Sequence, residues 1–190
     1  KAGRTEDAAL LYEQTLDLEP DHTGAMFNLA SLYAASNRYD DARRYYRRIL
    51  ELQPEDPEAL TNLGNLVQTI GNLEEAEGYY NRAIKQKPDL ALAHLNLGNL
   101  YLAKRKGAEA EKSFRTAIDL DPFLAQGYTN LGSVLWALDR YDEAEEVLNK
   151  AITLDPYNTD ALNNLGNVHT ERGAYDEALG FYQRAISLNP

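Results

Sequence analysis

Proline recurs at one fixed interval through this chain of 190 residues, and that interval restricts the possible folds more than any other feature. Successive prolines of one set lie 34 residues apart, and the set is Pro20, Pro54, Pro88, Pro122, Pro156 and Pro190. A repeat of about 20–50 residues indicates an array of stacked units. With this proline as position 32, residues 1–190 form a single array. Its complete units are 23–56, 57–90, 91–124, 125–158 and 159–190, and residues 1–22 are a partial unit, mainly its second helix.

Each unit contains two apolar stripes at helical spacing, separated by a turn. In the unit 57–90, the first stripe contains Leu60, Leu63 and Val67, and the second begins at Leu73. Residues at this spacing lie on one face of an amphipathic helix. Between the stripes lies Gly71, and glycine suits the left-handed residue that follows a helix end. The sequence therefore predicts an all-α protein built from antiparallel helix pairs.

Small and large residues occupy fixed positions in these helices. Position 8 is glycine in four units and Ala30 in the first complete one, position 20 is always alanine, and position 24 is aromatic except at Leu148. Glycine inside a helix costs about 1 kcal/mol relative to alanine, so its repetition implies a close approach of two helices. With leucine at position 7 and proline at 32, the pattern resembles the tetratricopeptide repeat over the whole chain. The resemblance implies a right-handed α-solenoid, or superhelix, with first helices on its concave face.

Asparagine occupies position 6 of every complete unit, and we call this row the Asn ladder: Asn28, Asn62, Asn96, Asn130 and Asn164. Position 9 continues the row with Asn65, Asn99 and Asn167, and with serine in the other two units. Asparagine is a mediocre helix former, so its repetition needs a reason. A primary amide can pair with both the N–H and the C=O of an extended peptide. We predict a scaffold whose Asn ladder holds an extended polypeptide in the concave groove. There are two alternatives: the asparagines bond to the backbone of a neighbouring unit, or duplication of the repeats has copied a neutral residue.

The family resemblance implies that ligand contacts come mainly from positions 2, 5, 6, 9, 12 and 13 of the first helices. The charged residues at these positions are Glu58, Asp160 and Glu171, and none is Lys or Arg. The basic clamp with which tetratricopeptide co-chaperones hold acidic tails is therefore missing. Four apolar residues of the middle units also occupy groove positions: Leu92, Leu95, Leu102 and Trp136. We expect them to add apolar contacts to a ligand, and packing against the next unit is the alternative for Trp136.

The composition argues against several functional classes. A net charge of −11 disfavours nucleic acid and acidic partners, and favours neutral or basic polypeptides. The least interrupted apolar stretch, residues 90–103, is shorter than the ~20 residues of a membrane helix. There is no cysteine, and the three histidines occupy different repeat positions. We therefore expect no metal, no cofactor and no enzymatic activity. Composition fits several compartments, of which we expect the cytoplasm.

Two further hypotheses remain. The Asn ladder is similar to the one that lines the superhelix of O-linked N-acetylglucosamine transferase. This resemblance implies that the chain could be the substrate-recognition arm of a protein O-glycosyltransferase whose catalytic domain is absent here. The other hypothesis is end-to-end self-association, because the last helix would present an apolar end made of Ala178, Tyr182, Ala185 and Ile186.

Overall fold

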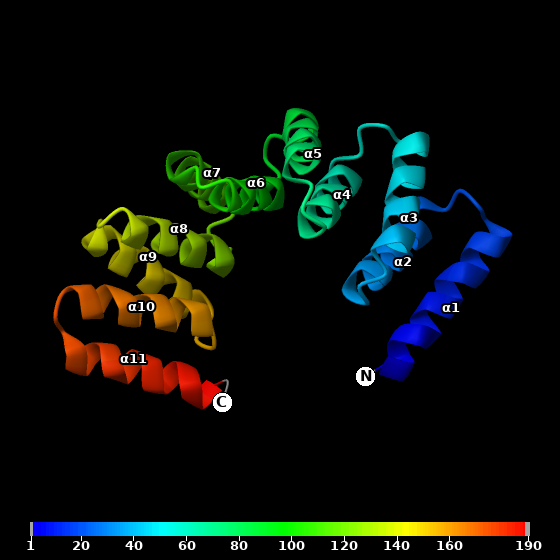
Figure 1. The fold of residues 1–190 in the computed structure, drawn as a ribbon. Helices are drawn as coiled ribbons and strands as arrows, with labels where there is room; N and C mark the ends of the chain where they lie inside the picture. Colours follow the sequence, from blue (N-terminus) through cyan, green and yellow to red (C-terminus); the bar gives the residue numbers. More distant parts are fainter. Residues whose placement is uncertain (1, 189–190) are drawn as a thin grey trace. The chain divides into compact units, whose positions relative to one another are not determined.

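A computed structural model describes residues 2–188 of the protein, with side chains from residue 7 onward. This part of the chain is entirely helical and contains no strand. The chain divides into two compact units, Lys1–Asp89 and Leu90–Pro190, and the division falls one residue before the end of the repeat 57–90. The first unit holds α1 (Ala2–Leu18), α2 (Thr23–Ala35), α3 (Tyr39–Leu52), α4 (Pro57–Thr69) and α5 (Leu73–Gln86) (Figure 1).

The second unit continues the same alternation of first and second helices. It holds α6 (Ala91–Ala103), α7 (Gly107–Leu120), α8 (Ala125–Ala137), α9 (Tyr141–Leu154), α10 (Thr159–Glu171) and α11 (Tyr175–Leu188). Consecutive helices pack as antiparallel pairs, as the labels of Figure 1 show for α8 with α9 and α10 with α11. The prediction of an all-α protein built from helix pairs is therefore confirmed.

The turn between the two helices of each repeat has one backbone geometry. Position 15 has a positive φ in all five turns, and its residues are Asn37, Gly71, Arg105, Asp139 and Gly173. The next residue donates its backbone N–H to a carbonyl five residues earlier, for example from Lys106 to Tyr101 at 2.8 Å. This is the Schellman arrangement, which satisfies carbonyls left free at a helix end. The turn at Arg105 therefore follows the others although it has no glycine at position 15.

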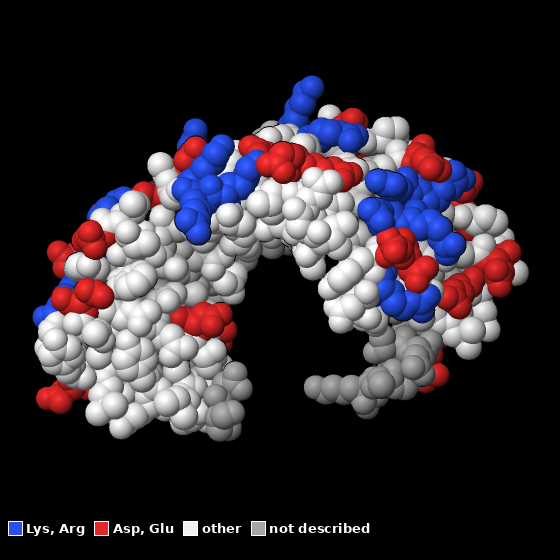
Figure 2. Space-filling model, viewed as in Figure 1, with Lys and Arg blue, Asp and Glu red and all other residues white. Residues whose placement is uncertain are grey.

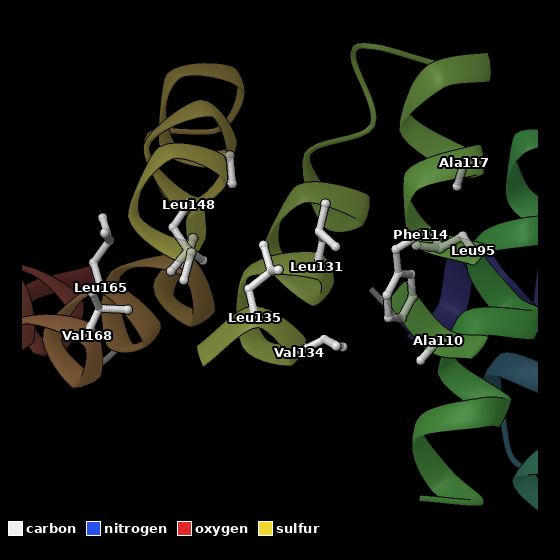
Figure 3. Close-up of a cluster of buried hydrophobic side chains, with 13 residues drawn as sticks. Leu95, Ala110, Phe114, Ala117, Leu131, Val134, Leu135, Leu148, Leu165 and Val168 are labelled. Atoms are coloured by element: carbon white, nitrogen blue, oxygen red, sulfur yellow. The ribbon is translucent and has the colours of Figure 1, made fainter. Parts of the chain in front are cut away.

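Position 8 is where the two helices of a repeat come closest. A Cβ atom added to Gly98 would lie 2.5 Å from Cε1 of Phe114, and one added to Gly64 would lie 2.6 Å from Cε1 of Tyr80. These distances are too short for any real contact, so the expected close approach is present. Figure 3 shows Phe114 in the buried cluster of the second unit, with Leu131, Leu135 and other side chains from α6 to α10.

Candidate functional site

The exposed surface of the first helices is a narrow stripe. Positions 2, 6, 9 and 13 lie on one helical face because they are spaced by four, three and four residues. In the described part of the chain, every residue at positions 2 and 13 is exposed, and those at 6 and 9 are exposed or half-buried. We call this surface the inner stripe. Position 5 faces the interior in three repeats, where Thr61 and Thr129 are buried, whereas Asn163 at position 5 of the last repeat is exposed.

The four apolar candidates differ in their exposure. Leu92 and Leu102 of α6 are 53% and 38% exposed, so both can contact a ligand. Leu95 is only 6% exposed and belongs to the core cluster, because position 5 faces the interior. This corrects the expectation that Leu95 lies on the groove surface. Trp136 is partly buried against the same cluster. Its Nε1 is buried and has no hydrogen-bond partner among the described residues.

The amides at position 6 have three different environments. Asn62 donates from Nδ2 to the backbone oxygen of Glu58 in its own helix, at 2.9 Å. Asn130 donates from Nδ2 to Oδ1 of Asn99 at 2.7 Å and accepts from Nε2 of Gln126 at 2.8 Å. Within residues 7–188, the remaining amides make no hydrogen bond, and they are Asn28, Asn96 and Asn164. None of the five therefore bonds to the backbone of a neighbouring repeat, which was the structural alternative.

In three repeats the side chain at position 9 is hydrogen-bonded to a tyrosine hydroxyl of the second helix. The hydroxyl of Tyr80 donates to Oδ1 of Asn65 at 2.8 Å, and that of Tyr182 donates to Oδ1 of Asn167 at 2.8 Å. Ser31 Oγ and the hydroxyl of Tyr46 lie 3.0 Å apart. We call these contacts tyrosine braces. Burial raises the pKa of Tyr80 far above its ordinary value, so the phenol stays protonated and able to donate.

Sequence reasoning missed the tyrosine braces because it assigned the chemistry of the stripe to first helices alone. The tyrosines belong to second helices, and their rings reach position 9 beside the small residue at position 8. Position 9 alone carried no signal, because it is Asn or Ser in all five complete repeats; the braced repeats differ from the others only by the tyrosine at position 24. Phe114 and Leu148, the residues at position 24 without a hydroxyl, show that this pairing varies between repeats.

The inner stripe of the first unit contains two shallow hollows. One has a volume of about 270 Å³ and is lined by residues of α2, α3 and α4, among them Ser31, Asn62 and Asn65. The other has a volume of about 280 Å³ and is lined in part by Asn28 and Glu58. Both are mostly polar and smaller than a typical pocket for a drug-sized molecule. Their size suits single side chains or backbone groups of a ligand.

Charged residues are unevenly distributed between the two kinds of helix. The second helix α3 carries Arg43, Arg44, Arg47 and Arg48. Figure 2 shows Lys and Arg side chains gathered in patches that are interleaved with Asp and Glu. On the inner stripe, Glu58, Asp160 and Glu171 are exposed, and within the described residues no ion pair includes Asp160 or Glu171. The stripe itself is thus neutral or acidic.

The apolar end expected on the last helix needs correction. Ala178 and Ala185 are buried, and the hydroxyl of Tyr182 donates a hydrogen bond to Asn167. Ile186 of that set is exposed, and Leu179 is a second exposed apolar residue of the same helix. The exposed apolar residues of α11 therefore differ from those that the sequence suggested.

No helix within residues 2–188 combines the length and the apolar character needed to cross a membrane. No group of three or more His, Asp or Glu side chains in the same range is arranged to hold a metal ion.

Comparison with known families gives the same description for the whole chain. Three family models described as tetratricopeptide repeat match residues 1–66, 61–125 and 123–190. No curated protein sequence matches the chain.

Several solved structures have the same fold, and the match covers nearly all of some of these chains and only part of another. The crystal structure of YrrB, described as a TPR protein with an unusual peptide-binding site, has a TM-score of 0.69 at 20% identity and covers 94% of this chain and 92% of its own. A thermophilic TPR protein of Thermus thermophilus has a TM-score of 0.73 at 24% identity, covering 88% and 92%. The Cut9-Hcn1 structure from the APC/C has a TM-score of 0.91 at 19% identity, with all of this chain matching 38% of that one. At these identities the likeness establishes the fold.

Proposed function

Because the chain belongs to the tetratricopeptide repeat family, we propose that it is an interaction scaffold that holds an extended segment of a partner polypeptide on its inner stripe. The observation that carries this proposal is the pair of side-chain amides at Asn96 and Asn164 of the second unit, which are half-buried and have no partner among the described residues. Asparagine in mid-helix is unfavourable, and these two gain no hydrogen bond within the described protein that offsets the cost. The backbone of a ligand would offer both amides a partner.

The chemistry of an amide suits a polypeptide backbone. Each free side chain offers two N–H donors and one carbonyl acceptor, which match the C=O and N–H of an extended chain. Such contacts do not depend on the side chains of the ligand. The exposed Leu92 and Leu102 of α6 add apolar contact area, which supplies affinity when a ligand covers it. The similar fold of YrrB, which has a peptide-binding site, supports this mode of action.

The charges of the inner stripe favour neutral or basic partners. Asp160 and Glu171 are exposed on α10 and could pair with Lys or Arg of a ligand. Glu171 is the more informative of the two, because an acidic residue in the last turn of a helix is disfavoured by the helix dipole. The recognition arm of a protein O-glycosyltransferase would be one scaffold of this kind, and it would use the same stripe.

Selection from a random peptide library tests the proposal. The wild-type chain and an Asn96→Ala/Asn164→Ala variant would be panned against displayed peptides of about twelve residues, and Kd values would be measured for recovered peptides. The two amides have no partner to lose, so alanine should not lower the melting temperature. Each lost hydrogen bond is worth about 1 kcal/mol, and losing two should weaken binding roughly 30-fold.

A matched control uses asparagines outside the inner stripe. Asn81 and Asn149 are exposed on second helices, so the variant Asn81→Ala/Asn149→Ala should bind like wild type. Equal affinity of all three proteins would refute a role for the Asn ladder. If the wild-type chain recovered no peptide, polypeptide capture by this stripe would be refuted.

A further inference from the structure

The tyrosine brace is missing in the two middle repeats. Position 24 is Phe114 in the repeat 91–124 and Leu148 in the repeat 125–158, and neither side chain has a hydroxyl. Asn99 and Ser133, the residues at position 9 of these repeats, therefore lack the contact that Asn65 receives from Tyr80. The inner stripe thus contains two classes of position-9 residue, those bonded to a tyrosine hydroxyl of the second helix and those that are not.

Phe114 and Tyr80 differ in the hydroxyl, whereas their rings are placed alike. The same three ring atoms of Phe114 and Tyr80, namely Cε1, Cδ1 and Cζ, lie closest to the Cβ that each position-8 glycine would carry. Gly98 faces Phe114 as Gly64 faces Tyr80. A hydroxyl on Cζ of Phe114 would consequently point toward Asn99, as that of Tyr80 points toward Asn65.

In this unbraced region the amides bond to one another. Gln126 donates to Asn130, and Asn130 donates to Asn99, so three side chains on α8 and α6 form a chain of hydrogen bonds. We call it the amide relay. Both N–H groups of Asn99 Nδ2 and the carbonyl oxygen of Gln126 remain free at its ends within the described structure. The relay therefore offers donors at α6 and an acceptor at α8.

We propose that the amide relay is where the scaffold exchanges hydrogen bonds with the backbone of a bound polypeptide, and that Phe114 keeps Asn99 exchangeable by lacking a hydroxyl. This inference rests on the proposed function and adds the relay residues to the amides without partners described there. An amide that accepts from a second-helix phenol is held in one orientation by a partner from its own repeat, as Asn65 is by Tyr80, whose hydroxyl also contacts Oε1 of Gln68 at 2.9 Å. A relay amide can exchange a neighbouring amide for a peptide group of the same chemistry.

Charge identifies the kind of segment that fits the relay. On α6 and α8 the inner stripe has no charged residue, and it consists of Leu92, Asn96, Asn99, Ala103, Gln126, Asn130, Ser133 and Ala137. The next first helix, α10, carries the exposed Asp160 and Glu171. The complementary ligand is an extended segment with uncharged residues over α6 and α8, an aliphatic side chain against Leu92, and Lys or Arg over α10.

The deciding variant is Phe114→Tyr, which adds one oxygen atom to a ring that is already in place. The new hydroxyl should bond to Asn99, raise the melting temperature, and weaken binding of the peptides selected by the wild-type chain about tenfold. Tyr80→Phe is the matched control, since it removes the same atom in the repeat 57–90. It should lower the melting temperature and leave peptide affinity equal or higher.

A second variant keeps the test independent of whether the new hydroxyl bonds as expected. Asn99→Ala removes the donor end of the relay, and it should also weaken binding about tenfold. The inference would be overturned if Asn99→Ala bound peptides as tightly as wild type. It would also be overturned if Phe114→Tyr had a raised melting temperature and unchanged peptide affinity. Either result would leave the proposed function intact. Failure of the wild-type chain to select any peptide would refute the proposed function, and this inference with it.

Discussion

Arg105 has a backbone conformation that other residues adopt at lower cost. Its φ is 58°, in the left-handed region, and two equivalent turns have glycine there, with φ of 90° at Gly71 and 74° at Gly173. A third has Asn37, and asparagine tolerates this region better than most residues with a Cβ. The Arg105 side chain is exposed, and the described structure shows no interaction for it. Its replacement therefore sacrifices no contact.

These facts give a magnitude for Arg105→Asn. The left-handed conformation costs an ordinary residue roughly 1–2 kcal/mol, and asparagine avoids part of this cost. We expect the free energy of unfolding to rise by about 0.5–1 kcal/mol. For a unit of this size that corresponds to a melting temperature higher by about 2–5 °C. Asparagine is preferable to glycine, because glycine would also increase the conformational entropy of the unfolded chain.

Urea unfolding followed by far-UV circular dichroism measures the change, with thermal unfolding as a second assay. Asp139→Asn is the neutral control, since both residues tolerate the left-handed region and both can accept the hydrogen bond from the hydroxyl of Tyr141. Gly173→Ala is the opposite control and should lower stability by about 1 kcal/mol. One result would refute the claim that the left-handed conformation of Arg105 costs stability. In it, Arg105→Asn is no more stable than wild type while Gly173→Ala is destabilised.

Two further outcomes concern binding and assembly. Trp136→Phe should leave the affinity for selected peptides unchanged within about twofold, because the indole packs on the core and its N–H has no partner to lose. A Kd about tenfold higher, measured by fluorescence anisotropy, would instead make Trp136 an apolar anchor. We also propose that exposed Leu179 and Ile186 on α11 allow weak self-association. The mass measured by light scattering should then rise with concentration and fall back in a Leu179→Glu/Ile186→Glu variant, and a constant monomer mass would contradict this.

The sequence was sufficient to predict the helix pairs because the same constraints recur in every repeat. Proline ends each second helix, and a left-handed residue ends each first helix, so the boundaries follow from local chemistry. Glycine at position 8 predicted the close approach seen at Gly98 and Phe114. These features depend on spacing along one chain, which a sequence displays directly.

Side-chain orientation was harder to predict. Leu95 was placed on the groove surface from its repeat position, but position 5 turns inward and the residue is buried. The tyrosine braces were missed because they join residues on different helices, and helical periodicity describes one helix at a time. Asn99 and Asn65 look equivalent in the sequence, yet their partners are Asn130 and Tyr80. A pattern identifies which residues share a face, whereas packing decides what each of them touches.

The glycine at position 8 leaves room in the first helix for the ring at position 24. The hydroxyl of Tyr80, which is 15 residues after Asn65 in the chain, therefore reaches the Asn65 side chain although the ring itself is buried. In the three repeats with tyrosine at position 24, the proposed binding surface therefore depends on two helices, because the side chains at positions 9 and 24 are bonded to each other. Anyone who transplants first helices between such proteins to transfer specificity would separate that pair. Grafts that move both residues together should preserve it.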